Sequence, residues 1–257
     1  MADLLKHSFD AAVVRSLGAD IARVSPRFDE RGFVRASLRG LGALELLARG
    51  RHVADAMRTF LPPDPVEALA ILERALGPVQ LGTVGLGMAP FRYLPHASFV
   101  ARFGLEHFEP AMRFQHALTQ RFTAEASIRP FLERYPEPTL ARLRAWASDP
   151  STHVRRLVSE GTRPRLPWAP RVRALVVDPR PVLELLELLR DDPERYVQRS
   201  VANNLNDIAK DHPALVVETC RRWLRGAGEG RRYIASHALR SLVKAGDPAA
   251  LRASPPP

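Results

Sequence analysis

Hydrophobic residues recur along this chain at spacings of three and four, which is the period of an α-helix. Clear examples are Leu69, Leu72 and Leu76 in PVEALAILERAL, and the run of leucines in PVLELLELL at 181–189. No stretch shows the strict alternation that predicts a β-strand. Clusters of Pro and Gly end the helical segments, at 61–65, 77–90, 134–138, 163–167 and 226–230. The pattern predicts an all-α protein.

The Gly-rich segment GPVQLGTVGLG at 77–87 superficially resembles a phosphate-binding loop. It lacks the Gly-Lys-Ser/Thr ending and a preceding strand, both of which such a loop requires. We therefore expect a connector between helices there.

A repeat of about 40 residues appears in the second half of the chain. SDPSTHVRRLVSEG at 148–161 aligns with DDPERYVQRSVANN at 191–204 at an offset of 43, and RRYIASHALRSLVK at 231–244 follows at an offset of 37. Periods of this length made of paired helices are typical of HEAT-like repeats. We expect one curved solenoid domain over 1–257, with an N-terminal helical part at about 1–110 and the clearest repeats at about 111–250.

Each repeat should bury one apolar stripe against its neighbours. In the second copy that stripe is Val197, Val201, Leu205 and Ile208, and in the third it is Ile234, Ala238, Leu242 and Ala245.

A second, polar face repeats in the same register. A spacing of four places Arg199, Asn203 and Asp207 in one row, with corresponding rows of Arg156 with Glu160, and of Ser236, Arg240 and Lys244. An ordinary solvated face would carry charges in no particular register. The alignment therefore favours a working surface on one lateral face of the solenoid.

Charge and composition narrow the function of that surface. The chain carries 38 basic and 28 acidic side chains, a formal net charge of +10, and residues 151–257 hold 19 of the basic against 12 of the acidic ones. The C-terminal part is where a polyanion would dock. No apolar run reaches the roughly 18 residues of a membrane span, and the N-terminus lacks a secretory signal, so we expect a cytoplasmic protein.

Cysteine and histidine give no sign of a metal site. Cys220 is the only cysteine, which excludes an internal disulfide and a Cys-rich zinc site, and it lies in a helical stripe typical of a buried core residue. The histidines at 153, 212 and 237 have no metal-ligand spacing. We expect no metal and no cofactor.

Several long motifs resemble the AlkC family of DNA alkylation-repair proteins. They are HVRRLVSEGTRPRLPWAPRVR at 153–173, RSVANNLNDIAKDHP at 199–213 and SHALRSLVKAG at 236–246, with LTQRFTAEASIRPFL at 118–132 and LPHASFVARFG at 94–104 further upstream. The resemblance implies a bacterial, monomeric, monofunctional DNA glycosylase, similar in architecture to the AlkD proteins. Its substrates would be cationic lesions in duplex DNA, such as 3-methyladenine, with 3-methylcytosine as a further candidate. Some members carry an additional immunoglobulin-like domain after the repeats, and we expect none here.

The chemistry of such lesions fits carboxylates on a basic face. A methylated ring nitrogen makes the base a positively charged leaving group, so what remains is to stabilise an oxocarbenium sugar and to position water. Asp207, in the motif NNLND, is the first candidate. Its alternative role is an ordinary surface pair with Lys210 at spacing three.

Two further carboxylates are candidates by resemblance. Glu160 ends a predicted helix just before Gly161, where the dipole disfavours a carboxylate by about 0.3–1 kcal/mol, and Arg156 one turn earlier is either a compensating partner or a contact to the lesion or a phosphate. Glu125 is the third carboxylate, with an ordinary helix pair to Arg129 as its alternative.

The remaining candidates would contact DNA. Trp168 lies in a Pro-bounded loop, where it packs either on the core or, as the resemblance implies, on the lesion. The expected DNA-binding residues are cations and amides that give affinity without sequence preference: Arg163, Arg165, Arg199, Asn203, Asn204, Lys210, Arg240 and Lys244.

The alternative function is a non-enzymatic HEAT-repeat module that binds DNA or protein. A DNA-binding module gains nothing from Glu160 and Asp207 on a basic face, because they repel phosphate. The carboxylates are thus the feature that separates the two functions.

Overall fold

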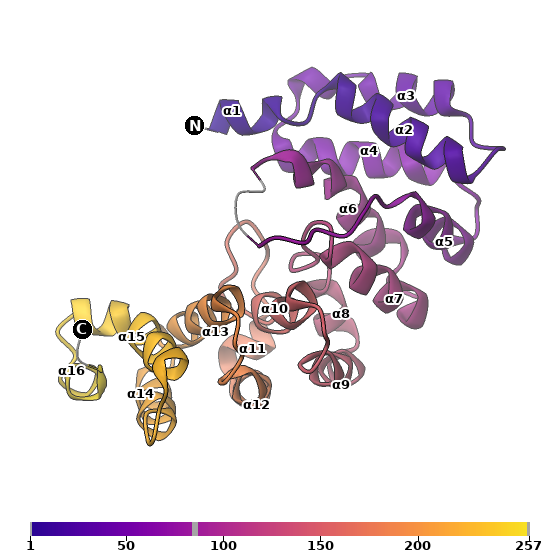
Figure 1. Cartoon of the computed structure of the whole chain (residues 1–257). Helices are drawn as coiled ribbons and strands as arrows, with labels where there is room; N and C mark the ends of the chain where they lie inside the picture. The colour runs from indigo at the N-terminus through magenta and orange to yellow at the C-terminus, as the bar shows by residue number, and fades with distance from the viewer. Residues whose placement is uncertain (1, 84–86, 256–257) are drawn as a thin grey trace. The chain divides into compact units, whose positions relative to one another are not determined.

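The computed structural model describes residues 2–83 and 87–255, and every regular element within these residues is a helix (Figure 1). The helices are α1 (Ala2–His7), α2 (Ala11–Val24), α3 (Glu30–Leu38), η1 (Leu41–Ala43), α4 (Leu46–Phe60), α5 (Pro65–Ala75), η2 (Ala89–Tyr93), α6 (Leu94–Phe103), α7 (Phe108–Thr119), α8 (Arg129–Arg134), α9 (Pro136–Trp146), α10 (Thr152–Gly161), α11 (Arg173–Val177), α12 (Arg180–Leu189), α13 (Arg195–Ile208), α14 (Pro213–Trp223), α15 (Glu229–Lys244) and α16 (Pro248–Ala253). The all-α prediction is confirmed. The Gly-rich segment is free of helix and strand over 77–83, and its residues 84–86 lie outside the described residues.

The chain forms two compact units, residues 1–131 and 132–257. In the N-terminal unit α4 packs on α6, α2 on α3 and α5 on α7. The side chain of Asp10 caps α2 by accepting hydrogen bonds from the amides of Ala12 and Val13 at 2.8 and 3.1 Å. Such a cap satisfies amides that have no partner within the helix, and it stabilises the helix by about 1 kcal/mol.

Aromatic and aliphatic side chains fill the core of this unit, including the fully buried Phe33, Phe99 and Phe114. His96 lies between Tyr93 and Phe114, with ring centroids 5.3 and 6.4 Å away. Burial, with the nearby charge of Arg92, lowers the pKa of His96 to about 3, so its imidazole is a neutral core group.

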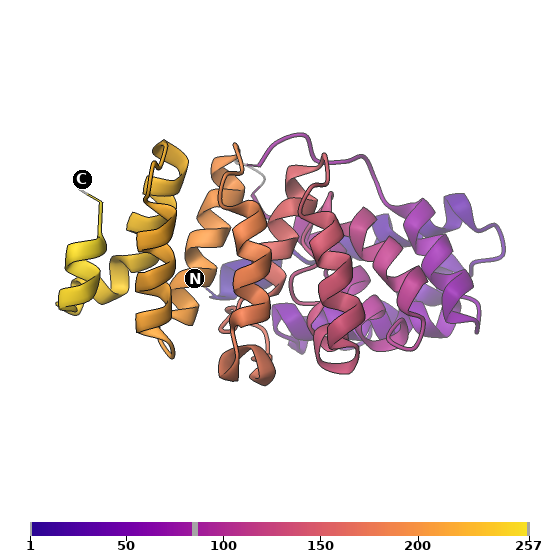
Figure 2. The same ribbon diagram turned by 90° about the horizontal axis from the view of Figure 1, so that it is seen from below.

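Helix pairs build the C-terminal unit. Helices α10, α13 and α15 contact one another in that order, and α9, α12 and α14 pack beside them, so that α9 with α10, α12 with α13 and α14 with α15 form successive pairs. Figure 2 shows the orange and yellow helices of this unit standing side by side. This is the helical-repeat arrangement that the offsets of 43 and 37 predict.

The buried stripe is as predicted in the second repeat and differs in the third. Val197, Val201, Leu205 and Ile208 are all buried. In the third repeat Ile234 and Ala238 are buried, but Leu242 is half-buried and Ala245 exposed, and Ala235 and Leu239 are buried instead. The prediction for the end of that stripe was wrong because α15 ends at Lys244 and only the short α16 follows it.

Cys220 is fully buried on α14, and burial raises the pKa of its thiol to about 12. The predicted core role of this cysteine is confirmed. Among the described residues no helix combines the length and the apolar character that crossing a membrane requires.

Candidate active site

Two buried carboxylates from neighbouring helices are joined by one arginine. Glu160 lies in the last turn of α10 and Asp207 in the last turn of α13, and they are 5% and 4% exposed. Arg163, just after the end of α10, donates from Nη1 to Glu160 Oε1 at 2.6 Å and from Nε to Asp207 Oδ2 at 2.8 Å. The two carboxylates, which the sequence places in the polar rows of two successive repeats, therefore belong to a single cluster.

Small and polar side chains allow α10 and α13 to pack closely at this point. Ser159 Oγ donates to Ser200 Oγ at 2.7 Å across the interface. Asn204 Nδ2 donates to the carbonyl of Ser159 at 2.7 Å and to Thr162 Oγ1 at 3.1 Å. These hydrogen bonds hold the end of α10, and with it Glu160, against α13.

Glu160 is held as an ion. Its Oε2 accepts from Ser200 Oγ at 2.6 Å, and its Oε1 lies 3.5 Å from Arg156 Nη2 in addition to the contact with Arg163. Burial alone would raise the pKa of Glu160, but the charges of Arg156 and Arg163 and the hydrogen bond from Ser200 outweigh it, so that the pKa lies below its ordinary value. Both oxygens of this carboxylate are engaged by the protein.

Asp207 has one fixed partner and one movable partner. Its Oδ1 accepts from Lys210 Nζ at 3.0 Å, which is the spacing-three pair expected from the sequence. The side chain of Lys210 is 47% exposed, whereas that of Arg163 is 12% exposed. Lys210 can swing into solvent at little cost, and Asp207 would then present a negative charge to a ligand.

Basic side chains continue from this cluster onto α13 and α15. Asn203, one turn before Asp207, accepts at Oδ1 from Arg240 Nη2 at 3.0 Å and from His237 Nε2 at 3.2 Å, and so links the polar rows of the two helices. Arg199, Arg240 and Lys244 are exposed, and none of them forms an ion pair within the described part of the chain. The predicted register of the polar rows of α13 and α15 is confirmed.

Arg163, a predicted phosphate contact, bridges two carboxylates: burial would lower its pKa, but Glu160 and Asp207 raise it. Its contact with a phosphate stays a prediction. The predicted DNA contact of Asn204 was wrong. Asn204 is fully buried, because it lies one residue away from the polar row, on the side of α13 that faces α10. Asn203, its neighbour in the sequence, is on the polar row.

Arg165 is also paired within the protein. It forms a bidentate ion pair with Asp211, in which Nε donates to Oδ2 at 2.9 Å and Nη2 donates to Oδ1 at 2.6 Å. A phosphate would have to compete with this carboxylate.

Trp168 lies in the loop that follows α10 and is 67% exposed. Its backbone has φ 64°, and no other non-glycine residue within 2–83 and 87–255 has a positive φ. Such a conformation is unfavourable for a bulky side chain and persists where the surroundings impose it, often at functional sites. Core packing, the alternative expected from the sequence, is excluded.

The guanidinium of Arg156 lies 5.0 Å from the centre of the Tyr196 ring while its Nη2 faces Glu160. The compensating role of Arg156 that the sequence suggested is therefore present in the structure. Its predicted contact with a lesion or phosphate stays a prediction.

Glu125 belongs to the N-terminal unit and lies in the turn before α8. Thr123 Oγ1 donates to its Oε2 at 2.7 Å. Helix α8 begins only at Arg129, so Glu125 does not lie in the same helix as Arg129. Its catalytic role stays a prediction.

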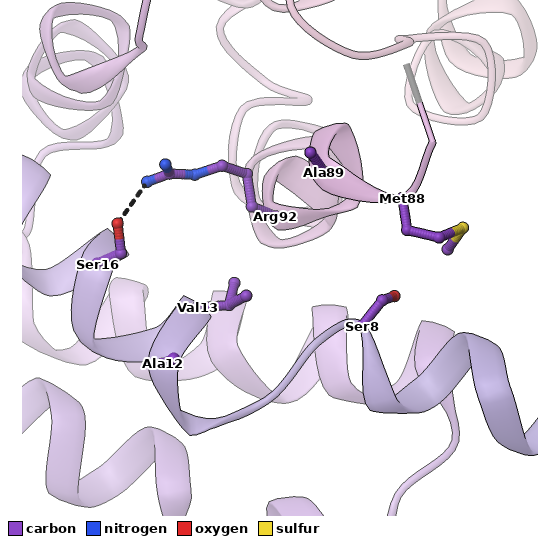
Figure 3. A pocket seen from close by; sticks show the side chains of 7 residues that line it. All are labelled: Ser8, Ala12, Val13, Ser16, Met88, Ala89 and Arg92. Atoms are coloured by element: carbon purple, nitrogen blue, oxygen red, sulfur yellow. Dashed lines mark hydrogen bonds between the residues drawn. The ribbon is translucent and has the colours of Figure 1, made fainter. Parts of the chain in front are cut away.

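No group of three or more His, Cys, Asp or Glu side chains suited to a metal occurs within the residues that the structure describes. A pocket in the N-terminal unit is lined by Ser8, Val13, Ser16, Met88 and Arg92, among others (Figure 3). Arg92 is the cation of this pocket, and it is paired with Asp20. The pocket thus presents no uncompensated charge to a ligand.

Comparison with known proteins gives this geometry its context. Residues 116–222 match a family described as DNA alkylation repair enzymes. The chain is 39% identical over 252 residues to YhaZ of Bacillus subtilis, a protein named as uncharacterized, covering 98% of this chain and 68% of YhaZ. The solved structure of Pseudomonas fluorescens alkylpurine DNA glycosylase AlkC, bound to DNA containing an abasic site analog, superposes with a TM-score of 0.88 at 35% identity, over 97% of this chain and 67% of that chain. This chain belongs to the AlkC family.

It is thus an enzyme of DNA alkylation repair built from helical repeats. The matched family segment, 116–222, contains Glu125, Glu160, Trp168 and Asp207. The basic residues Arg240 and Lys244 of α15 lie outside the matched segment.

Sequence reasoning missed Ser200 and His237, which contact Glu160 and Asn203 in the structure. Ser200 adjoins the apolar stripe. It contacts Glu160 in the neighbouring repeat, and the alignment of the two repeats at an offset of 43 does not pair these two positions. His237 was considered only as a metal ligand, and its contact with Asn203 depends on how α13 and α15 pack. No pattern in a single sequence marks either contact.

Proposed function

We propose that this AlkC-family enzyme is a monofunctional DNA glycosylase, acting in base excision repair, that hydrolyses the N-glycosidic bond of cationic N-alkylated bases. Its first substrate would be 3-methyladenine, and 3-methylcytosine presents the same chemistry. The observation that carries the proposal is the pair of buried carboxylates, Glu160 and Asp207, held by one arginine beside exposed, unpaired cations.

The lesion itself makes departure of the base easy. When the bond between the sugar C1′ and the base nitrogen breaks, its electron pair neutralises the positive charge of the methylated base. The sugar is left as an oxocarbenium ion, and water adds to C1′ and releases a proton, giving an abasic site. Stabilising the oxocarbenium ion is therefore the main task of the enzyme, and a fixed negative charge performs it.

Asp207 is suited to that task because Lys210 can leave it without disturbing the core. A carboxylate at this position would lie against the developing positive charge and orient the attacking water. Glu160, with both oxygens engaged, would act as a second fixed charge and would hold Arg163 in place. A catalytic role for Glu125 is part of the proposal and rests on the family resemblance.

Trp168 and Arg156 would contact the lesion. An exposed indole can stack on a base or pack on a sugar, and the strained loop keeps Trp168 away from the core. Arg199, Asn203, Arg240, Lys244 and Lys210 would contact phosphates and so supply affinity for duplex DNA without sequence preference.

The monofunctional character has its own physical argument. A glycosylase that also cleaves the strand needs a neutral amine to attack C1′. Lys210 Nζ lies 3.0 Å from Asp207 Oδ1, and on DNA binding it would leave this carboxylate for solvent or a phosphate, which takes the amine away from C1′. The product should therefore be an intact strand with an abasic site.

The proposal includes a single repeat domain over 1–257, action as a monomer, no metal or cofactor, and a cytoplasmic location, where bacterial DNA is found. The alternative, a non-enzymatic repeat module, is disfavoured by the carboxylates. They oppose phosphate binding and have a use only if a positive charge develops nearby.

The decisive experiment is Asp207→Asn. The amide keeps the size of the side chain but removes its charge, so release of 3-methyladenine from methylated duplex DNA should fall on the order of 10²–10³-fold. Binding to the duplex should hold or improve, because a charge that repels phosphates has gone. Chromatography of the released bases and a strand-cleavage gel without alkali would measure both the rate and the state of the product.

Asp211→Asn is the matched control. Asp211 is also paired with an arginine after α10, but its carboxylate is more exposed than that of Asp207. Its variant should release bases at the wild-type rate. Wild-type release by both Asp207→Asn and Glu160→Gln would contradict the carboxylate mechanism.

A further inference from the structure

One oxygen atom of Asn203 contacts both an arginine and a histidine of α15. Its Oδ1 accepts from Arg240 Nη2 at 3.0 Å and lies 3.2 Å from Nε2 of His237. Arg199 stands one helical turn before Asn203 on α13. The His237 ring also stacks on Tyr233, with centroids 5.7 Å apart and an angle of 6° between the rings.

These contacts decide the tautomer of His237. Arg240 can only donate, so the atom of Asn203 that it meets is the oxygen. The same oxygen must accept from His237, which places the hydrogen of the neutral ring on Nε2. Nδ1 then carries a lone pair, makes no hydrogen bond within the described residues and is not enclosed by protein.

The surroundings of this ring hold positive charge that no carboxylate contacts directly. Burial lowers the pKa of His237, and the charges of Arg240 and Arg199 lower it further. Burial also lowers the pKa of Arg240; Asp207 opposes that shift, while Arg163 and Arg199 add to it. Helices α14 and α16 also pack on α15, and among the described residues none of their charges acts on His237.

Like charges that lie close together raise the free energy of the protein, and an anion in contact with them lowers it. We propose that Arg199, His237 and Arg240 form a site for one phosphate of the DNA backbone, and that His237 takes up a proton from solvent as that phosphate enters. The new proton sits on Nδ1, and this N–H donates to a phosphate oxygen while Nε2–H keeps its bond to Asn203.

The inference rests on the proposed function, since it names one contact of the same DNA-binding surface. It adds His237, which the formal net charge of the sequence counts as neutral, to the residues that contact DNA. Asn203 lies one helical turn from Asp207. The phosphate held here would therefore be one that lies close to the damaged nucleotide. DNA binding by this enzyme would then be coupled to pH near neutrality, where histidine changes charge.

Isothermal titration calorimetry with an undamaged duplex tests this directly. At about pH 7, in two buffers that differ in ionisation enthalpy, the difference in apparent binding enthalpy gives the number of protons taken up. The wild-type protein should take up a substantial fraction of one proton. His237→Gln, which keeps a donor for Asn203 but cannot be protonated, should lose that uptake and bind less tightly below about pH 7.

His212→Gln is the matched control, because His212 lies in the same unit and is hydrogen-bonded to the carbonyl of Val176, away from the polar row. Its proton uptake should equal that of the wild type. Circular dichroism melting of each variant shows whether it is folded. Equal uptake by folded His237→Gln and the wild type, or no uptake by the wild type, would overturn the inference while leaving the glycosylase proposal standing. Failure of the wild type to bind the duplex would instead contradict the proposed function itself.

Discussion

At the scale of single residues, the two buried carboxylates Glu160 and Asp207 differ in the partners that hold them. Glu160 has both oxygens engaged by Arg163, Arg156 and Ser200, whereas Asp207 relies partly on the exposed Lys210. A charge that is fully held can stabilise its surroundings but cannot move a proton or reach a ligand easily. In the proposed mechanism Asp207 therefore takes the reactive position and Glu160 the supporting one.

The first residue-scale prediction concerns Glu160→Gln and pH. The folded-state pKa of Glu160 lies below its unfolded value of about 4.3, so its contribution to stability is fully present above that pH and is lost as pH falls through the lower folded value. The variant should lose about 1–3 kcal/mol at neutral pH. The gap from the wild type should narrow as the solution is acidified.

Thermal melts between about pH 3 and pH 7 would measure this. Glu184→Gln, which breaks the exposed pair with Arg144, is the control and should stay within about 0.5 kcal/mol of the wild type at every pH. A gap for Glu160→Gln that does not change with pH would mean that Glu160 is not ionised in the folded protein.

The second residue-scale prediction concerns the strained loop. Glycine adopts a φ of 64° without penalty, so Trp168→Gly should leave the melting temperature unchanged or raise it, while release of 3-methyladenine falls at least tenfold. Val177→Ala, at another exposed apolar residue, should leave both quantities unchanged. A clear drop in melting temperature for Trp168→Gly would show that the indole packs against the protein.

At the scale of elements, the interface between α10 and α13 positions the site. Ser159, Ser200, Asn204 and Thr162 form a polar layer there, in place of the leucines and valines that join the helices elsewhere. A layer of hydrogen bonds fixes the relative position of two helices more strictly than apolar contact does, because a shift leaves buried groups without partners. The carboxylate cluster lies at the end of this layer.

Two neighbouring asparagines on α13 should therefore behave differently. Asn204→Ala removes two buried hydrogen bonds and should destabilise the protein by about 1–3 kcal/mol. Asn203→Ala lies on the polar row and should change stability by less than about 1 kcal/mol while weakening DNA binding. Urea unfolding and a duplex binding titration of both variants would check this. Equal loss of stability would mean that the two faces of α13 are not distinct.

At the scale of the whole molecule, the net positive charge governs the affinity for DNA. The excess of basic side chains, +10 overall, is concentrated in 151–257, and Arg199, Arg240 and Lys244 lack carboxylate partners in the described structure. Neutralising phosphates releases counterions, so affinity for an undamaged duplex should fall steeply as salt rises.

Each neutralised phosphate contributes about one to the slope of log K against log salt, so Lys244→Ala should make the slope less steep by about one. Arg199→Ala and Arg240→Ala should each reduce it by less, because these two residues would share one phosphate. Fluorescence anisotropy at several salt concentrations would measure the slopes. An affinity that does not respond to salt would remove duplex DNA from the partners of this enzyme.

The amino-acid sequence by itself determined the all-helical class, the repeats at offsets of 43 and 37, and the placement of Asp207, Asn203 and Arg199 on one face of a helix. These features are local, because a helix of 3.6 residues per turn places side chains four apart on the same side whatever packs against it. The family motifs extended the prediction to Glu160 and Trp168.

Only the tertiary structure decided which polar groups face one another. Arg163 meets Asp207 across 44 residues, Ser200 meets Glu160 across 40, and Asn204 is buried where its neighbour Asn203 is not. Such contacts depend on how far each helix is rotated and how closely the two approach, and those quantities come from packing over the whole repeat. For the same reason the sequence could expect a phosphate contact at Arg163, while the fold places that charge between two carboxylates.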